Sequence, residues 1–261
     1  MKLTKVTAAL MAVVMAAACG CGSRKVGNVN DPKDDPVSAE PAQTTTEEST
    51  TEPPPEDKRV HVIAAGDNLI HYSVFKNAEK LAGPGESFDF KPLYKNVKYL
   101  IEDADLAILN QETIISQSNG LRGADGGALI FNSPPEVADA VIDLGFDVFT
   151  MANNHLLDFG PDALEESIRF WNDKAEKNDL TVLGAYLDQA DADRIRTREV
   201  NGVKFAFLAY AEHINGFEYG SAFIESPLRV VMNYEEDVIE RQIREAREMA
   251  DVVVVSAHWG V

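Results

Sequence analysis

Cysteine is almost absent from this sequence. Its 261 residues include two, Cys19 and Cys21, and both lie close to the N-terminus. Because the rest of the chain has no thiol, a disulfide framework is excluded there and a structural zinc site built from thiolates is disfavoured. A hydrophobic fraction of 45% supplies enough apolar side chains for a packed core instead.

Positive charge is also scarce. Lys and Arg number 24 against 43 Asp and Glu, which gives a formal net charge of −19 at pH 7. Nucleic acid is excluded as a partner, because phosphate binding needs a basic face. An anionic polymer would be repelled as well unless cations or a local basic patch bridge it. Arg122, Arg169 and Arg241 are too scattered to predict such a patch.

The apolar run near the N-terminus is too short to cross a bilayer. Val6–Ala18 is 13 residues long, follows two lysines and ends in small residues, which is typical of an export signal over residues 1–22. Cys19 or Cys21 stands where a bacterial lipoprotein would be cut and acylated, although the usual Leu three residues earlier is missing at both. We therefore expect an extracytoplasmic protein anchored to the cell membrane by a lipid. An ordinary signal peptide, giving a secreted protein, or an uncleaved anchor is the alternative.

Residues 23–58 contain too few apolar side chains to form a hydrophobic core. From Asp31 to Lys58 there are nine acidic residues and two lysines, a net of 9 − 2 = 7 negative charges, among many Pro, Thr and Ser. Such a segment buries too little apolar surface to fold and repels itself into an extended form. The composition predicts a disordered tether that spaces a domain, residues 59–261, away from the membrane.

Within residues 59–261 the pattern alternates between strands and helices, which favours an α/β domain with a largely parallel sheet. Asn201-Gly202 predicts a two-residue hairpin turn. Ser133 is the predicted cap of a helix that ends at Gly145, and Gly160-Pro161 opens another helix. The other predicted elements are strands at 60–65, 106–109, 147–151, 194–200, 203–210 and 251–257, and helices at 93–101 and around 239–250.

The last predicted strand delivers His258, and the chain ends three residues later. A natural domain rarely stops at the mouth of its own site. The sequence is therefore interpreted as a fragment that is incomplete at its C-terminus.

Polar residues recur where the predicted strands end, and in α/β sheets the carboxyl ends of strands are where ligands bind. Each residue alone has a simpler explanation as a helix cap or a turn residue. Together, oxygen and imidazole donors from four loops predict a divalent cation site for Mn, Fe, Mg or Zn. His61 is interpreted as structural and His213 as an ordinary loop residue. The donors are Asp67 with His71, Asn110 with Glu112, Asn153-Asn154-His155 with Asp158, and His258.

These strings occur in an ordered set that resembles the CapA family of poly-gamma-glutamate capsule synthesis proteins. The resemblance runs from about Val60 to the final residue and implies a fold similar to the calcineurin-like metallophosphoesterases, a sandwich of two β-sheets flanked by helices. The matching strings are Gly66-Asp67 with His71, Asn110-Gln111-Glu112-Thr113, Phe131-Asn132-Ser133-Pro134, Ala152-Asn153-Asn154-His155 through Gly160, Tyr210 to Gly216, and His258-Trp259-Gly260.

The resemblance also implies roles for individual residues. His155 would be the catalytic general acid for a leaving group. His71 lies four residues beyond Asp67 and not two, so it is only a further candidate, as are Asn110 and Asp158. A Gly-His-x-His-type segment, which would complete the site, is expected beyond the end of this sequence. The implied metal ligands are Asp67, Glu112 as a bridging carboxylate, Asn154 and His258.

Three functional hypotheses follow. The first is a metal-dependent hydrolase or transferase that makes, anchors or remodels poly-gamma-glutamate or a related anionic envelope polymer. The second is a non-catalytic accessory lipoprotein of a membrane polymer synthase, whose subunits would be its partners. The third is a surface-binding lipoprotein without a metal.

Overall fold

A computed structural model of the chain describes residues 57–125 and 127–259. The predicted export signal, the candidate lipid-attachment sites Cys19 and Cys21, and the predicted tether up to residue 56 lie outside the described residues. The described part is an α/β fold with two main sheets and a short β-ribbon, so the predicted fold class is confirmed.

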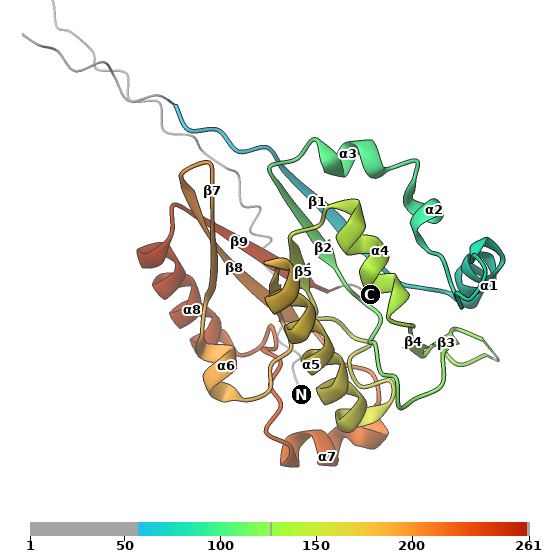
Figure 1. The fold of residues 1–261 in the computed structure, drawn as a ribbon. Coiled ribbons are helices and arrows are strands. Elements are labelled where there is room, and N and C mark those ends of the chain that lie inside the picture. Colours follow the sequence, from blue (N-terminus) through green and yellow to red (C-terminus); the bar gives the residue numbers. More distant parts are fainter. Residues whose placement is uncertain (1–56, 126, 260–261) are drawn as a thin grey trace, which may run out of the picture. The chain divides into compact units, whose positions relative to one another are not determined.

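The first sheet is parallel throughout and carries the predicted strand ends. Its strands follow the order β1 Val62–Asp67, β2 Leu106–Asn110, β5 Val148–Thr150 and β6 Thr181–Leu183. β2 and β5 are fully buried, as the apolar runs predict for strands covered on both faces. The register pairs Asp67 with Asn110 and Asn110 with Thr150. Three strands therefore finish at the same edge of the sheet (Figure 1).

The second sheet contains β7 Arg196–Val200, β8 Val203–Ala211 and β9 Val252–His258. β7 and β8 form the predicted hairpin, and both turn residues have positive φ, 50° at Asn201 and 72° at Gly202, as a two-residue primed turn requires. β9 runs parallel to β8 and brings His258 opposite Ala211. The β-ribbon pairs β3 Arg122–Gly123 with β4 Phe131–Asn132.

Helices cover the two sheets. α8 packs on β8 and β9 (Figure 1). α5 packs on β6. The predicted helix around 239–250 and the helix opened by Gly160-Pro161 are both present, as α8 and α5. The helices are α1 Tyr72–Leu81, α2 Lys91–Tyr94, α3 Lys98–Glu102, α4 Glu136–Leu144, α5 Gly160–Asn178, α6 Gln189–Asp193, α7 Gly220–Glu225 and α8 Glu236–Met249, together with a 3₁₀ helix, η1 Phe217–Tyr219.

Two local predictions about helices are wrong. The helix predicted at 93–101 is divided into α2 and α3, with a turn in which the Val97 amide donates to the Tyr94 carbonyl at 2.9 Å. The Tyr94 hydroxyl is held by Asn68 at 2.9 Å. Ser133 does not cap α4, because its hydroxyl donates to Thr113 Oγ1 at 2.9 Å. The end of α4 is as predicted, since Gly145 has a φ of 108°.

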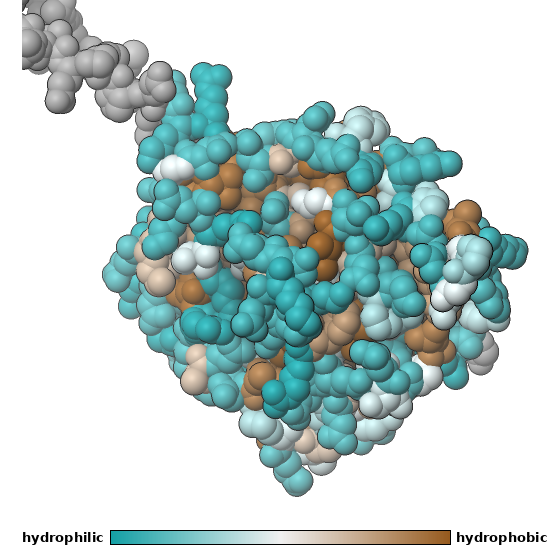
Figure 2. All heavy atoms as spheres, viewed as in Figure 1, coloured by the Kyte–Doolittle hydropathy of each residue, from teal (hydrophilic) through white to brown (hydrophobic). Residues whose placement is uncertain are grey.

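The two sheets share one hydrophobic core. It contains residues of β2, β5 and β8 and the buried Leu164, Ile168 and Trp171 of α5. The Ser256 hydroxyl of β9 also contacts the Thr150 hydroxyl of β5 at 3.2 Å. Hydrophilic residues cover most of the face shown in Figure 2. In the part of the chain that the structure describes, no helix combines the length and apolar character needed to cross a membrane.

Candidate metal centre

Three donor side chains from both sheets converge at the strand ends. Asp67 ends β1, Glu112 follows β2 and His258 ends β9, and one ligand atom from each lies within 4.8 Å of the others. We call these three residues the strand-end cluster. His258 Nδ1 is 3.6 Å from Asp67 Oδ1, and His258 Nε2 is 3.7 Å from Glu112 Oε1. This is the grouping of carboxylate and imidazole donors that the strand-end pattern predicts.

The backbone of β1 and a hydrogen-bond relay fix Asp67. The pairing of β1 with β2 is irregular between Ala65 and Asp67. Asn110 Nδ2 donates to Asp67 Oδ1 at 2.6 Å, and Thr150 Oγ1 donates to Asn110 Oδ1 at 3.2 Å. Asn110, a further candidate from the sequence, therefore lies beside the cluster and orients one of its carboxylates.

Asn154 and His155 reach the cluster from the loop after β5. The Asn154 carboxamide oxygen lies 2.9 Å from His258 Nε2. His155 is buried, and its Nε2 is 3.9 Å from Glu112 Oε1. The His155 amide donates to Asn153 Oδ1 at 3.0 Å, which ties the loop into a tight turn. The predicted amide ligand and the predicted acid thus stand next to the three donors.

Asp158 fixes the orientation of His155. Its Oδ2 lies 2.8 Å from His155 Nδ1 and also accepts from the Phe131 amide at 2.7 Å. The Asp158 side chain is fully buried, and its Oδ1 has no hydrogen-bond partner. The contact with Asp158 at Nδ1 orients the ring so that Nε2 faces Glu112.

His71 lies outside the strand-end cluster. Its ring packs edge-on against Phe131 with centroids 5.2 Å apart, and Phe131 in turn packs against His155 at 4.6 Å. His71 also precedes the first residue of α1. The Phe131 ring therefore lies between His71 and His155. Among the described interactions, His71 contacts neither the Asp67 nor the Glu112 carboxylate.

Two close backbone contacts hold the loop that carries His155, and sequence reasoning did not predict them. Gly184 has a φ of 104°, and a Cβ there would lie 2.4 Å from the Ala152 amide nitrogen. Gly216 has a φ of 82°, and a Cβ there would lie 2.6 Å from the Leu157 carbonyl oxygen. Both positions therefore require glycine. The only signal in the sequence was the Asn215-Gly216 pair, which marks a turn but not what the turn contacts.

Asn215 and His213 are further residues near the site. The Asn215 amide donates to the Asn154 carbonyl at 2.7 Å, and its Nδ2 lies 3.5 Å from His155 Nδ1. His213 follows β8, next to the end of β9, and helps to lower the pKa of His258. The sequence interpretation of His213 as an ordinary loop residue missed this proximity.

The electrostatics of the cluster favour a cation. Burial raises the pKa of Glu112 to about 7, and the Asp67 carboxylate beside it adds to this shift. Burial also lowers the pKa of His258, against the opposing effect of Asp67. In the part of the chain that the structure describes, the charged groups that shift the pKa of Glu112 are the carboxylates of Asp67 and Asp158 and the imidazole of His155. A buried, uncompensated carboxylate beside a second one is the environment that a bound divalent cation would neutralise.

The raised pKa of Glu112 predicts pH-dependent stability of the metal-free protein. The folded pKa of about 7 lies above the ordinary value of 4.5, so the stabilisation is present below that ordinary value and is lost as the pH rises through 7. Glu112→Gln in EDTA should raise the free energy of unfolding by about 2 kcal/mol at pH 8. Little change is expected at pH 4, and urea unfolding at both pH values measures the difference.

The exposed Glu199 offers a matched control. Glu199→Gln removes a carboxylate on β7 and should leave the stability unchanged at either pH. A Glu112→Gln protein that is destabilised at pH 8, or changed equally at both pH values, would show that burial does not act on this carboxylate as described.

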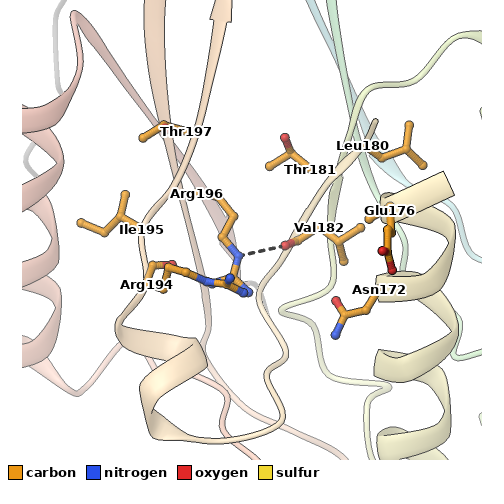
Figure 3. Close-up of a pocket in the computed structure, with 10 residues that line it drawn as sticks. Asn172, Glu176, Leu180, Thr181, Val182, Arg194, Ile195, Arg196 and Thr197 are labelled. Atoms are coloured by element: carbon orange, nitrogen blue, oxygen red, sulfur yellow. Dashed lines mark hydrogen bonds between the residues drawn. The ribbon is translucent and has the colours of Figure 1, made fainter. Parts of the chain in front are cut away.

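A cavity elsewhere in the fold is lined by arginine side chains. It has a volume of about 560 Å³ and lies between α5 and the start of β7 (Figure 3). Arg196 Nε donates to the Val182 carbonyl at 3.3 Å, and both Arg194 and Arg196 pair with Asp191, at 2.6 and 2.7 Å. These guanidinium groups are engaged within the fold, so the cavity offers no comparable cluster of donors.

Comparisons with known proteins test the resemblance. Residues 61–261 match the family described as "Bacterial capsule synthesis protein PGA_cap". The "Capsule biosynthesis protein CapA" of Bacillus anthracis is 29% identical over 175 residues, which are 64% of this chain and 40% of that protein. The "PGA biosynthesis protein CapA" of Bacillus subtilis (strain 168) is 25% identical over 169 residues, 64% of this chain and 42% of that protein.

An "Uncharacterized protein y4sH" of Sinorhizobium fredii is 28% identical over 123 residues, 46% of this chain and 26% of that protein. The chain thus spans less than half the length of the two CapA relatives. The family match, by contrast, covers well over half of the chain. The predicted resemblance is therefore confirmed, and this chain belongs to the bacterial capsule synthesis protein family PGA_cap, the family of the CapA proteins.

Proposed function

We propose that the chain contributes a metal-dependent hydrolase or transferase site to the synthesis, anchoring or remodelling of poly-gamma-glutamate or a related anionic envelope polymer. The observation that carries this proposal is the convergence of Asp67, Glu112 and His258 from two sheets. The names of the CapA relatives, which refer to capsule and PGA biosynthesis, support the polymer class.

Four residues would hold the metal. Asp67, Glu112, Asn154 and His258 supply carboxylate, amide and imidazole donors that point toward one another. Such a set of donors is typical of sites that bind Mn, Fe, Zn or Mg. A structural zinc site, in contrast, favours thiolates. When bound, divalent cations at such a site activate a water molecule and stabilise the charge that develops on an attacked phosphoryl or acyl centre.

The remaining side chains would transfer a proton or orient other side chains of the site. His155 presents Nε2 toward Glu112 from a buried position, and we assign it the transfer of a proton to the leaving-group oxygen. Asp158 lies at Nδ1 of that ring and would keep it in the orientation that this transfer needs. Asn110 keeps one oxygen of Asp67 in place by a hydrogen bond from its amide.

The proposed location is the cell envelope, outside the membrane. An export signal over residues 1–22 with a lipid on Cys19 or Cys21, and an acidic tether over residues 23–58, would present the domain, residues 59–261, to an exported polymer. Subunits of a membrane polymer synthase would be its partners there. These assignments rest on the sequence pattern and on the capsule-related names of the relatives.

The proposal is tested by metal content and hydrolysis together. We expect the purified protein to retain Mn, Fe or Zn near stoichiometry in elemental analysis. It should also hydrolyse a simple phosphoester such as bis(4-nitrophenyl) phosphate or cleave poly-gamma-glutamate, and EDTA should remove the activity. A folded protein that binds no metal under these conditions would exclude this function and leave a surface-binding role.

A non-catalytic accessory role is the second candidate. It is favoured by the formal net charge of −19 of the whole chain, because an anionic polymer is repelled by a protein of this charge. An accessory protein would co-purify with membrane synthase subunits and would bind metal without turning over either substrate. The effect of removing His155, treated in the Discussion, separates it from the catalytic function.

A further inference from the structure

A large cavity adjoins the strand-end cluster. It has a volume of about 690 Å³ and lies between the loop after β8, helix α7 and the segment that precedes α8. We call it the Asn215 cavity after the residue that separates it from His155. Its volume falls within the range of pockets that bind small molecules.

The wall of the Asn215 cavity is mainly apolar. Its lining includes the buried Leu157, Leu228, Val230 and Met232 and the half-buried Phe223. Transferring hydrocarbon from water to such a wall is favourable in proportion to the area buried. An extended polyanion, in contrast, would lose hydration here without gaining partners.

The strongest charges in the lining are already paired. The Arg229 guanidinium donates from Nε to Gln189 Oε1 at 2.8 Å and forms an ion pair with Glu235. Glu235 Oε1 also accepts from the Met232 amide at 2.8 Å. These two charges are therefore engaged in internal interactions, and the polar side that remains is formed by Glu212, His213 and Asn215.

That polar side leads to the site. Asn215 Nδ2 is 3.5 Å from His155 Nδ1, and the Asn215 amide donates to the Asn154 carbonyl. The Glu212 amide donates to the His258 carbonyl at 3.0 Å. Leu157, two residues after His155, belongs to the wall of the cavity. A ligand that fills the cavity would thus have one end beside Asn215, next to the His155 ring whose Nε2 faces Glu112 of the strand-end cluster.

The opposite side has exposed apolar residues. Ile224 of α7 is 83% exposed and Tyr234 is 71% exposed, and both line the cavity. Their exposure extends the apolar wall out to solvent, so a chain longer than the cavity could continue across this rim.

We propose that the Asn215 cavity binds the hydrocarbon chain of an amphiphilic substrate whose anionic head group lies at the strand-end cluster. The proposal rests on the function proposed above and narrows its substrate class from any envelope phosphoester or polymer to one that carries an aliphatic chain next to the reacting group. The apolar wall of the cavity suits the hydrocarbon chain of such a molecule. The strand-end cluster, which is suited to a cation, suits its anionic head group.

The test uses n-alkyl phosphates of increasing length as probes. Binding of butyl, hexyl and octyl phosphate to the Mn²⁺-loaded protein is measured by calorimetry below the micelle concentration. Affinity should rise roughly threefold to fourfold with each methylene group, or on the order of 100-fold from butyl to octyl. The phosphate head is the same in all three probes, so the gain with length reports on the cavity alone.

A blocking variant shows where the chain binds. Gly220 begins α7 and lines the cavity, and a Cβ added there would meet no atom within 4 Å. Gly220→Trp should therefore fill the cavity without straining the backbone and reduce the gain from butyl to octyl to less than about threefold. Gly120→Trp is the matched control, because position 120 has the same open space and lies outside the cavity.

The outcomes separate this inference from the proposed function. Affinity that does not change with chain length, while butyl phosphate still binds, would overturn the Asn215 cavity as the tail site and leave the metal site standing. Chain-length dependence that Gly220→Trp abolishes, in a protein that hydrolyses no phosphoester, would support the cavity and count against the catalytic function. A failure of all three probes to bind would overturn the inference.

Discussion

Replacing Asp67 with alanine is expected to remove metal from the protein. The side chain ends β1 with one oxygen held by Asn110 and the imidazole of His258 3.6 Å away. Among the described residues, Glu112 is the one other carboxylate of the cluster, and it already occupies the other side. The metal affinity should fall by more than the roughly 10- to 100-fold that loss of an outer hydrogen-bond partner typically costs. Elemental analysis after exposure to Mn²⁺ and desalting measures the occupancy.

The control is Asp173→Ala, which removes an exposed carboxylate of α5 whose ion pair with Lys177 lies on the surface. Its metal content should equal that of the wild type, and far-ultraviolet circular dichroism should show that both variants are folded. A folded Asp67→Ala protein with unchanged metal content would place the bound ion somewhere other than the strand-end cluster.

Replacing His155 with alanine should lower kcat by about 10²- to 10⁴-fold, the usual contribution of a positioned general acid, while the metal content stays unchanged. The reason is geometric, since His155 faces Glu112 with Nε2 while Asp158 holds Nδ1. Steady-state hydrolysis of a phosphoester whose leaving group needs a proton measures the effect. A substrate with an activated leaving group such as 4-nitrophenolate should be much less sensitive.

His61→Ala is the matched control for this experiment. His61 is exposed, and its Nδ1 contacts only the Asp103 carbonyl, at 3.0 Å, among its described side-chain interactions. Equal rates for His155→Ala and the wild type, with metal bound in both, would argue against a catalytic role and favour the accessory function. Activity lost together with the metal would instead assign His155 a structural role in the cluster.

The strands and the hairpin were the most predictable parts of the fold. Apolar runs such as 106–109 and the Asn201-Gly202 pair carry local signals that the tertiary structure follows. The helix at 93–101 was wrong because its apolar spacing fits one helix, whereas the structure anchors Tyr94 to Asn68 and buries Ile101 separately. Short elements such as β6 and α7 were not predicted, since three to six residues give too little periodicity.

The candidate site was predictable to the extent that parallel strands end at one edge. From that rule, the sequence alone predicts that Asp67, Asn110 and Glu112 lie close together. The functional roles of these residues stay predictions. The placement of Asn215 could not be predicted, because its contacts with Asn154 and His155 join segments 60 residues apart. The same holds for Gly184 and Gly216, which are required by backbone atoms of other loops and not by their own turns.

The origin of the cluster in two different sheets has a mechanical consequence. Asp67 and Glu112 move with the first sheet, whereas His258 moves with the second. An ion bound to all three would act as a cross-link across the core, so part of its binding free energy would appear as folding stability. Conversely, any change that slides one sheet against the other would loosen the ion's coordination, even if every ligand were kept.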